Sequence, residues 1–208
     1  MGRKIVAILT SKWFLTTFGL LVGAGVILAI RFVTYAPETV HYHANFAVYI
    51  NGQQEQFKDM KYYEETAATS CSIHPIASPL DRAHMHDNVS SVVHVEDHLV
   101  TWGNFFQNLN WGIGDNYLKT ADQFYIASDQ SQLTFMLNGK RVDSIANTII
   151  SDQDKLLVSY GSDTSQVIQK QYDKIQNNAA KNDAKQDPAS CSGNHVKVDT
   201  KARLSHLF

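Results

Sequence analysis

The feature that most constrains this chain is an apolar segment near its N-terminus. Eighteen residues from Trp13 to Ile30, WFLTTFGLLVGAGVILAI, carry no charge, and FVTY after Arg31 extends the apolar run. A helix needs roughly 20 such residues to cross the hydrocarbon core of a bilayer, and the Arg31 side chain can reach the interface. We therefore expect a transmembrane helix within residues 1–35.

The charges around this segment predict its orientation. Arg3, Lys4 and Lys12 precede it, whereas the first lysine after Arg31 is Lys58. Basic residues favour the cytoplasmic end of a span. We expect residues 1–35 to form a cytoplasmic start and a signal anchor, a single pass in the cell membrane that leaves 36–208 extracytoplasmic. A cleaved signal peptide is the alternative, but the apolar run is long for one and proline follows the best cleavage position.

The charge distribution excludes one class of partner. Hydrophobic residues make up 44% of the chain and charged residues 18%, which is typical of a folded protein. Residues 36–169 hold 7 Lys and Arg against 16 Asp and Glu, whereas residues 170–208 hold 7 against 4. Nucleic-acid binding requires clustered basic residues, so we expect no nucleic-acid partner. An acidic body instead attracts cations.

Residues 36–161 are predicted to form a small extracytoplasmic domain of the α+β class with a mixed β-sheet. Asn51-Gly52 and Asn138-Gly139 are each flanked by alternating apolar residues, the pattern of a tight β-hairpin. The hairpins are separated by a predicted strand over 91–100 and an aromatic helix over 101–109, and a strand over 155–161 follows. This order is similar to a β-grasp layout.

The C-terminal part is predicted to be a helix and a tail. Residues 162–183 place Ile168, Tyr172 and Ile175 at i, i+4 and i+7, which is one narrow apolar stripe of a helix. Residues 184–208 are polar and predict a flexible tail.

The chain has two cysteines, Cys71 and Cys191. An even pair outside the membrane favours a disulfide, so we expect these two to be joined. Neither lies in a C-x-x-C motif, which argues against a thioredoxin-like redox centre.

Seven of the nine histidines lie between positions 41 and 98, and several are spaced two residues apart. Residues i and i+2 of an extended chain point to the same side, so such pairs can meet if their segments are adjacent. Imidazole nitrogen binds zinc and copper, and nearby carboxylates (Asp87, Glu96, Asp97) could be ligands or could fix the histidine tautomer. The sequence predicts a copper or zinc site formed by His41, His43, His84, His86, His94 and Glu96.

Three other interpretations stay open. The histidines could be ordinary polar residues of a strand surface. They could lie in the polar interface of an anchored accessory subunit that docks onto a membrane or envelope complex. They could also belong to a His/carboxylate enzyme, although the chain has no G-x-S-x-G or phosphate-loop motif.

The signal anchor combined with HYHANFAVYINGQ, HMHDNVSSVVHVE and TWGNFF resembles a group of small membrane-anchored bacterial extracytoplasmic proteins of unassigned function. Their motifs are H-x-H, H-x-H-D and H-x-E. The chain departs from them with NVSS where a glycine turn is expected, and with the additional His98. The resemblance covers residues 41–161, supplies no activity, and points to His41, His43, His84, His86, Asp87, His94 and Glu96.

Overall fold

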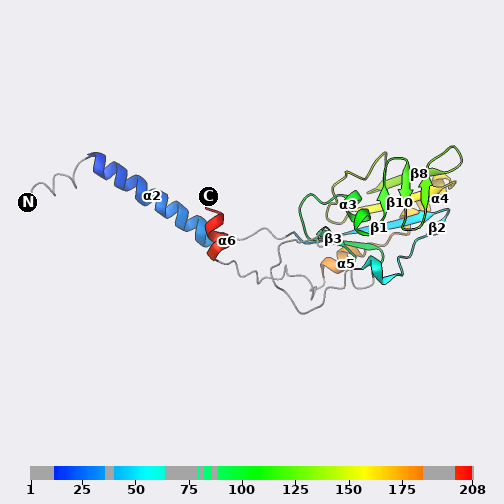
Figure 1. The fold of residues 1–208 in the computed structure, drawn as a ribbon, viewed down its shortest axis with the longest axis horizontal. Helices are drawn as coiled ribbons and strands as arrows, with labels where there is room; N and C mark the ends of the chain where they lie inside the picture. Colours follow the sequence, from blue (N-terminus) through cyan, green and yellow to red (C-terminus); the bar gives the residue numbers. More distant parts are fainter. Residues whose placement is uncertain are drawn as a thin grey trace, which may run out of the picture. The chain divides into compact units, whose positions relative to one another are not determined.

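The computed structural model (Figure 1) describes residues 12–35, 40–63, 79, 82–85, 89–184 and 200–207. The chain divides into two compact units, Met1–Glu38 with Lys197–Phe208, and Thr39–Val196.

The first unit is built on α2, Lys12–Thr34. Its only charged residues are Lys12 and Arg31, and none of its residues is buried. Within the described ranges it is the one helix that is long and apolar enough to cross a membrane. The predicted apolar helix is therefore present, and its length and composition suit a membrane span or a signal anchor.

A second helix, α6 (Thr200–Ser205), packs against the C-terminal end of α2. The Arg203 Nη1 atom donates hydrogen bonds to the carbonyl oxygens of Phe32 at 2.6 Å and Val33 at 2.9 Å. The last carbonyls of a helix have no partner within that helix, so Arg203 caps α2. The sequence did not lead us to expect α6, which lies in the predicted tail, and residues 185–199 are outside the described part.

The second unit contains a mixed sheet. Its first and last long strands, β1 (Tyr42–Ile50) and β10 (Lys155–Gly161), pair in parallel at its centre, and the other strands pair antiparallel. The α+β class with a mixed sheet is thus confirmed. The order across the sheet is β3 (Ala83–His84), β4 (Val92–Val95), β1 (Tyr42–Ile50), β10 (Lys155–Gly161), β8 (Gln132–Leu137) and β9 (Lys140–Val142), with β2 (Gln53–Gln54) also beside β1.

Both predicted hairpins are confirmed. Asn51 and Gly52 have φ angles of 50° and 79° between β1 and β2, and Asn138 and Gly139 have 51° and 79° between β8 and β9. Two consecutive positive φ angles define the type I′ turn, which matches the twist of the flanking strands. Asn-Gly is the pair that adopts this conformation most readily.

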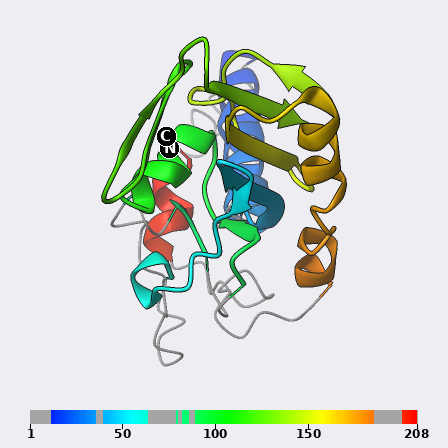
Figure 2. The same ribbon diagram turned by 90° about the vertical axis from the view of Figure 1, so that its right-hand side faces the viewer.

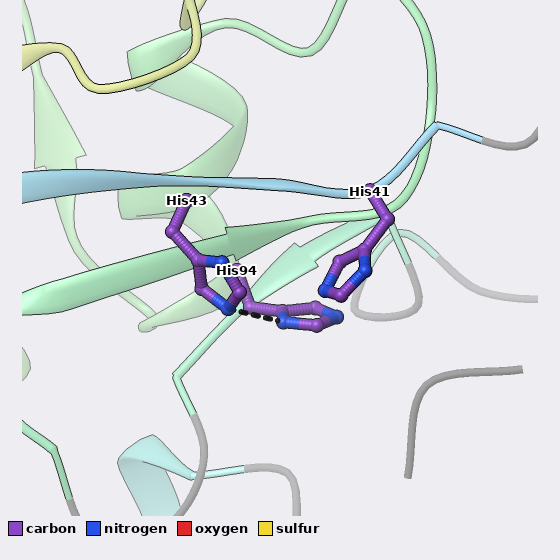
Figure 3. Close-up of side chains that lie close together, drawn as sticks. All are labelled: His41, His43 and His94. Atoms are coloured by element: carbon purple, nitrogen blue, oxygen red, sulfur yellow. Dashed lines mark hydrogen bonds between the residues drawn. The ribbon is translucent and has the colours of Figure 1, made fainter. Parts of the chain in front are cut away.

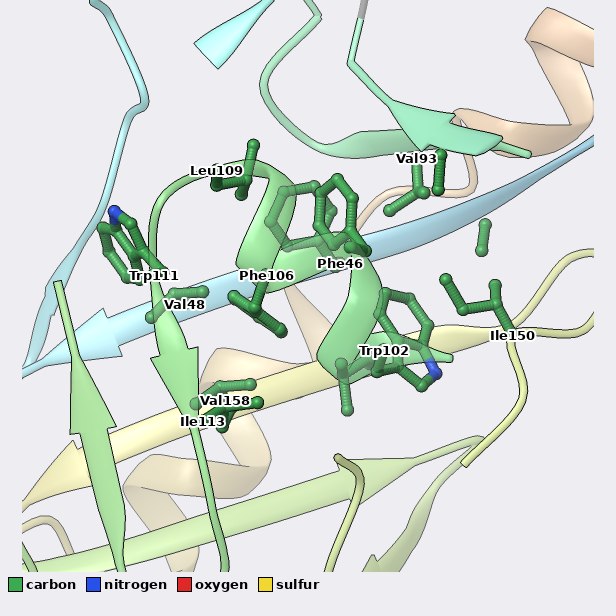
Figure 4. Close-up of a cluster of buried hydrophobic side chains, with 14 of the residues drawn as sticks. Phe46, Val48, Val93, Trp102, Phe106, Leu109, Trp111, Ile113, Ile150 and Val158 are labelled. Atoms are coloured by element: carbon green, nitrogen blue, oxygen red, sulfur yellow. The ribbon is translucent and has the colours of Figure 1, made fainter. Parts of the chain in front are cut away.

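The main core lies between one face of this sheet and α3, Trp102–Asn108. The predicted aromatic helix is present with Thr101 as its N-cap, and Trp102, Phe105 and Phe106 are buried against β1 residues such as Phe46 (Figure 4). A 3₁₀ turn, Met60–Tyr62, precedes β3. A small antiparallel sheet follows α3, formed by β5 (Gly112–Ile113), β6 (Tyr117–Lys119) and β7 (Phe124–Ile126).

The predicted helix over 162–183 is two helices, α4 (Ser165–Asp173) and α5 (Ala179–Asp183). In Figure 2 they lie, in gold and orange, on the opposite side of the sheet from α3. The predicted stripe of Ile168, Tyr172 and Ile175 is buried in a second apolar cluster. The helix breaks because buried Asn45 of β1 accepts a hydrogen bond from the Ala179 backbone N–H at 2.8 Å.

The predicted strand over 91–100 is shorter than expected. The strand β4 ends at Val95, and Leu99, which the alternation places on the buried face, has a φ of 58° and is 71% exposed. The alternation of a strand no longer determines which side chains are buried once the backbone has turned.

Candidate metal centre

Three histidines form one row across three adjacent strands. His43 of β1 lies opposite His94 of β4, and His94 lies opposite His84 of β3. Residues directly opposite each other in an antiparallel pair point to the same face, so all three rings share one face. This is the face that α5 covers, because odd-numbered residues of β1 point toward α4 and α5 and even-numbered ones toward α3.

His41, two residues before His43, completes the cluster. His41, His43 and His94 each offer one ring nitrogen, and these nitrogens all lie within 4.8 Å of one another (Figure 3). The centre of the His41 ring is 5.1 Å from the centre of the His43 ring and 4.6 Å from the centre of the His94 ring. The i, i+2 spacing thus brings together His43 of β1 and His41 just before that strand, and the cross-strand register adds His94.

The two buried imidazoles form the middle of a hydrogen-bonded chain that has a carboxylate at each end. Asp183 Oδ1 lies 2.6 Å from His43 Nδ1, and Glu96 Oε1 lies 2.9 Å from His94 Nε2. Between the rings, His43 Nε2 lies 2.9 Å from His94 Nδ1. Asp183 is the last residue of α5, and its other oxygen accepts a hydrogen bond from Gln153 Nε2.

The two carboxylates determine where the N–H proton of each imidazole lies, and so which ring nitrogen of each histidine carries a lone pair. An ionised carboxylate only accepts hydrogen bonds, so His43 donates from Nδ1 and His94 donates from Nε2. A neutral imidazole has one N–H, and the facing nitrogens, His43 Nε2 and His94 Nδ1, then both carry lone pairs. Two lone pairs at 2.9 Å require a cation between them, either a proton or a metal ion.

The two central imidazoles are buried, whereas their carboxylate partners are partly exposed. His43 is 1% exposed and His94 2%, whereas the side chains of Asp183 and Glu96 are 30% and 32% exposed. A shallow pocket beside the rings is lined by His43, Val89, Val92, His94 and Asn182, and as bounded by the described residues it has no room for a water-sized molecule. Among the described residues, the space beside the two rings therefore suits an ion better than an organic molecule.

The other residues that the sequence assigns to the site lie in different places. His84 is buried beside His94, with ring centres 4.9 Å apart, but it is not in the group of three converging nitrogens. Glu96 contacts His94 as a hydrogen-bond acceptor. Asp97 pairs with Arg82 at 2.7 Å. His86, Asp87, Cys71 and Cys191 lie outside the described residues, so the disulfide gains no support and stays a prediction.

Asp183 is the site residue that the sequence does not predict. It lies 140 positions from His43 and ends a polar segment with no motif. The available signal was the apolar stripe of the preceding helix, which predicts packing on the sheet. That stripe alone does not say which acidic residue reaches a histidine.

Comparison with known proteins does not assign the chain to a family. No family model, no curated protein and no solved structure matches the chain. The resemblance to the membrane-anchored bacterial group is therefore untested, and the function has to be argued from the histidine cluster and the apolar helix.

Proposed function

We propose that this protein is a single-pass, membrane-anchored extracytoplasmic domain that binds one copper or zinc ion through His41, His43 and His94. The observation that carries the proposal is the pair of facing nitrogens, His43 Nε2 and His94 Nδ1, 2.9 Å apart. A carboxylate at the far nitrogen of each ring, from Asp183 and Glu96, is the arrangement that orients histidine ligands toward a metal.

The distances fit a metal after a small movement of the rings. Zinc binds imidazole nitrogen at about 2.0–2.1 Å, which separates two tetrahedral ligands by about 3.3–3.4 Å. The facing nitrogens need to move apart by only a few tenths of an ångström from their 2.9 Å separation. His41 supplies a third nitrogen, and three histidines with an open fourth position form a known type of zinc site. His84 and His86 are candidates for that position.

The metal test uses the purified full chain in detergent. Metal analysis and calorimetric titration with Zn²⁺ and Cu²⁺ are expected to show one ion per chain. His94→Ala is expected to abolish tight binding, because it removes a ligand and leaves His43 facing a cavity. His98→Ala is the matched control, since His98 is exposed beyond the end of β4. No uptake of either metal, or equal uptake by both variants, would reject the proposal.

The alternatives are less well supported. An accessory subunit with histidines in a polar interface needs them at the surface, whereas His43 and His94 are buried. An enzyme needs room for a substrate beside the histidines, which the pocket lacks within the described residues.

We further propose that the domain has a β-grasp-like layout and that the N-terminus is cytoplasmic. A β-grasp-like layout is supported by the parallel pairing of β1 and β10 in the middle of the sheet and by α3 on one face. A cytoplasmic N-terminus is supported by Arg3, Lys4 and Lys12 before the apolar helix.

A further inference from the structure

The C-terminal segment 200–207 returns to the end of the apolar helix. Besides the Arg203 cap on Phe32 and Val33, the Arg31 Nη2 atom donates a hydrogen bond to the carbonyl oxygen of His206 at 3.1 Å. The His206 ring stacks on Tyr35, with ring centres 4.3 Å apart. These contacts come from both segments, so α6 is fixed at one end of α2.

The surface of this segment is both basic and apolar. Lys201 is exposed, and neither 12–35 nor 200–207 contains an aspartate or a glutamate. Leu204, one helical turn after Lys201, is 50% exposed, although a leucine gains nothing from contact with water. Residues at i and i+3 lie on neighbouring parts of a helix surface, so α6 presents an apolar and a cationic side chain together.

The length of α2 places this surface at the edge of a bilayer. Its 23 residues span about 35 Å at 1.5 Å per residue, slightly more than a hydrocarbon core of roughly 30 Å. Phe32 and Val33, which Arg203 contacts, are therefore near the headgroups once α2 is inserted. At that depth an exposed leucine can enter the acyl region while lysine and arginine side chains reach lipid phosphates.

We propose that α6 is an interfacial helix that binds anionic phospholipid headgroups through Lys201, Arg203 and Arg31, with Leu204 inserted beside the span. The partner is a lipid surface because residues 200–207 carry only positive side-chain charge and α6 packs on the end of the apolar helix that we propose to span the membrane. This inference goes beyond metal binding, and it depends only on insertion of α2 into a membrane.

Hydrogen–deuterium exchange of the full chain in nanodiscs tests this inference. One set of discs contains phosphatidylcholine alone, and the other also contains phosphatidylglycerol. A metal chelator is present throughout, so the result is independent of the histidine site. Amides of 200–207 are expected to exchange more slowly in the anionic discs. Lys201→Gln should lower the protection of these amides in the anionic discs by up to about fivefold, because one basic residue at an anionic surface contributes about 1 kcal/mol to binding.

Two further variants complete the test. Leu204→Asn is expected to speed exchange of 200–207 in both kinds of disc, because it removes the inserted apolar group. Lys181→Gln, a matched charge removal at an exposed position of α5, is expected to change nothing in this segment. Exchange of 200–207 that is the same in both lipids, or that is unprotected in both, would overturn the inference.

Discussion

At the scale of single residues, the histidine cluster depends on its two carboxylate partners. Asp183 holds the Nδ1 proton of His43, and Glu96 holds the Nε2 proton of His94. The position of the proton decides which nitrogen remains as a ligand. Replacing a carboxylate is therefore expected to change the affinity of the proposed metal site without removing a ligand.

Asp183→Asn is expected to weaken zinc binding by roughly 10–100-fold, the usual effect of removing a carboxylate that orients a histidine ligand. The amide keeps the size of the side chain but no longer carries the charge that stabilises the His43 N–H. Calorimetric titration of the full chain measures the affinity. Asp173→Asn on α4 is the control, because Asp173 is exposed and accepts a hydrogen bond only from Gln169 among the bonds described. Equal affinities for the two variants would show that Asp183 does not orient the ligand.

A second prediction concerns Tyr42, the first residue of β1, which lies between His41 and His43 in the sequence. Burial first, and then the carboxylates of Asp154 and Asp152, raise the pKa of the Tyr42 hydroxyl above its ordinary value of 10.0. The folded protein therefore favours the neutral phenol. The resulting contribution to stability is complete below about pH 10 and is lost as the pH rises through the folded-state pKa.

Tyr42→Phe removes this dependence together with the hydrogen bond that Tyr42 donates to the Ile150 carbonyl at 2.7 Å. We expect the free energy of unfolding to fall by about 1 kcal/mol at neutral pH and to decline less steeply above about pH 10. Some loss of stability above about pH 10 remains in the variant, because burial also raises the pKa of Tyr49 and Tyr172. Urea unfolding at a series of pH values measures both effects, and an unchanged alkaline slope would contradict the assignment.

The sequence predicted the direction of a side chain best where that direction depends only on neighbouring residues. The i, i+2 rule predicts that His41 and His43 point to one side, and the alternation around His94 predicts its face. Strand register and the position of Asp183 depend on long-range packing, which a single sequence does not specify. The pairing of His43 with His94, and the carboxylate behind His43, therefore required the structure.

At the scale of secondary-structure elements, Asn45 connects the histidine cluster to its covering helix. Its side chain donates to the Asp154 carbonyl and to Asn177 Oδ1, each at 3.3 Å, and accepts from the Ala179 N–H at 2.8 Å. These bonds start α5 at Ala179 and so place Asp183 near His43. The break between α4 and α5 is a tertiary effect, which explains why the periodicity over 162–183 predicts a single helix.

Asn45→Ala is expected to destabilise the domain by about 1–3 kcal/mol, because it leaves buried backbone groups without their partners. Hydrogen exchange of 179–183 should also become faster, and zinc affinity should fall because Asp183 is less well positioned. Asn178→Ala, which removes a side-chain bond to Ser91 Oγ at the same turn, is the comparison. If Asn45→Ala loosens 179–183 no more than Asn178→Ala does, Asn45 is not the residue that places α5.

Helix α3 offers a prediction in which two effects oppose each other. Alanine is favoured over glycine inside a helix by about 1 kcal/mol. A Cβ at Gly103, however, would lie 2.4 Å from the backbone carbonyl oxygen of Ala146, which also accepts the Gly103 N–H hydrogen bond at 3.0 Å. The contact is with backbone, so the clash outweighs the helix propensity.

Gly103→Ala should therefore lower the free energy of unfolding by about 1–3 kcal/mol, the usual cost of overpacking. Gln107→Ala, at an exposed position of the same helix, should be neutral or slightly stabilising. Urea unfolding of both variants gives the comparison. A stabilised Gly103→Ala variant would mean that the 146–148 segment moves freely away from α3.

Secondary structure was predictable where one residue pair determines the backbone. Asn51-Gly52 and Asn138-Gly139 produce their turns by local conformational preference, and Thr101 caps α3 through its own hydroxyl. The helix α6 was not predictable, because its hydrogen bonds to Phe32 and Val33 join segments at opposite ends of the chain.

At the scale of the whole molecule, the two units of the chain suit two different environments, a bilayer and water. The unit that contains α2 exposes apolar side chains throughout and suits a bilayer, whereas Thr39–Val196 has its own buried core and its own histidine site. Composition predicts this division well, because an 18-residue uncharged run and an acidic body differ so strongly.

The division predicts that residues 39–196, expressed without the rest of the chain, fold as a water-soluble domain with the metal affinity of the full protein. The core of β1, β10 and α3 lies within this range, and domains with such cores unfold cooperatively with roughly 5–15 kcal/mol of stability. Circular dichroism during urea unfolding and zinc titration are the measurements. The same fragment with His94→Ala should fold but not bind, which separates loss of the site from loss of the fold. A fragment that folds cooperatively yet binds zinc far more weakly than the full chain would show that metal binding is not confined to residues 39–196, against this prediction.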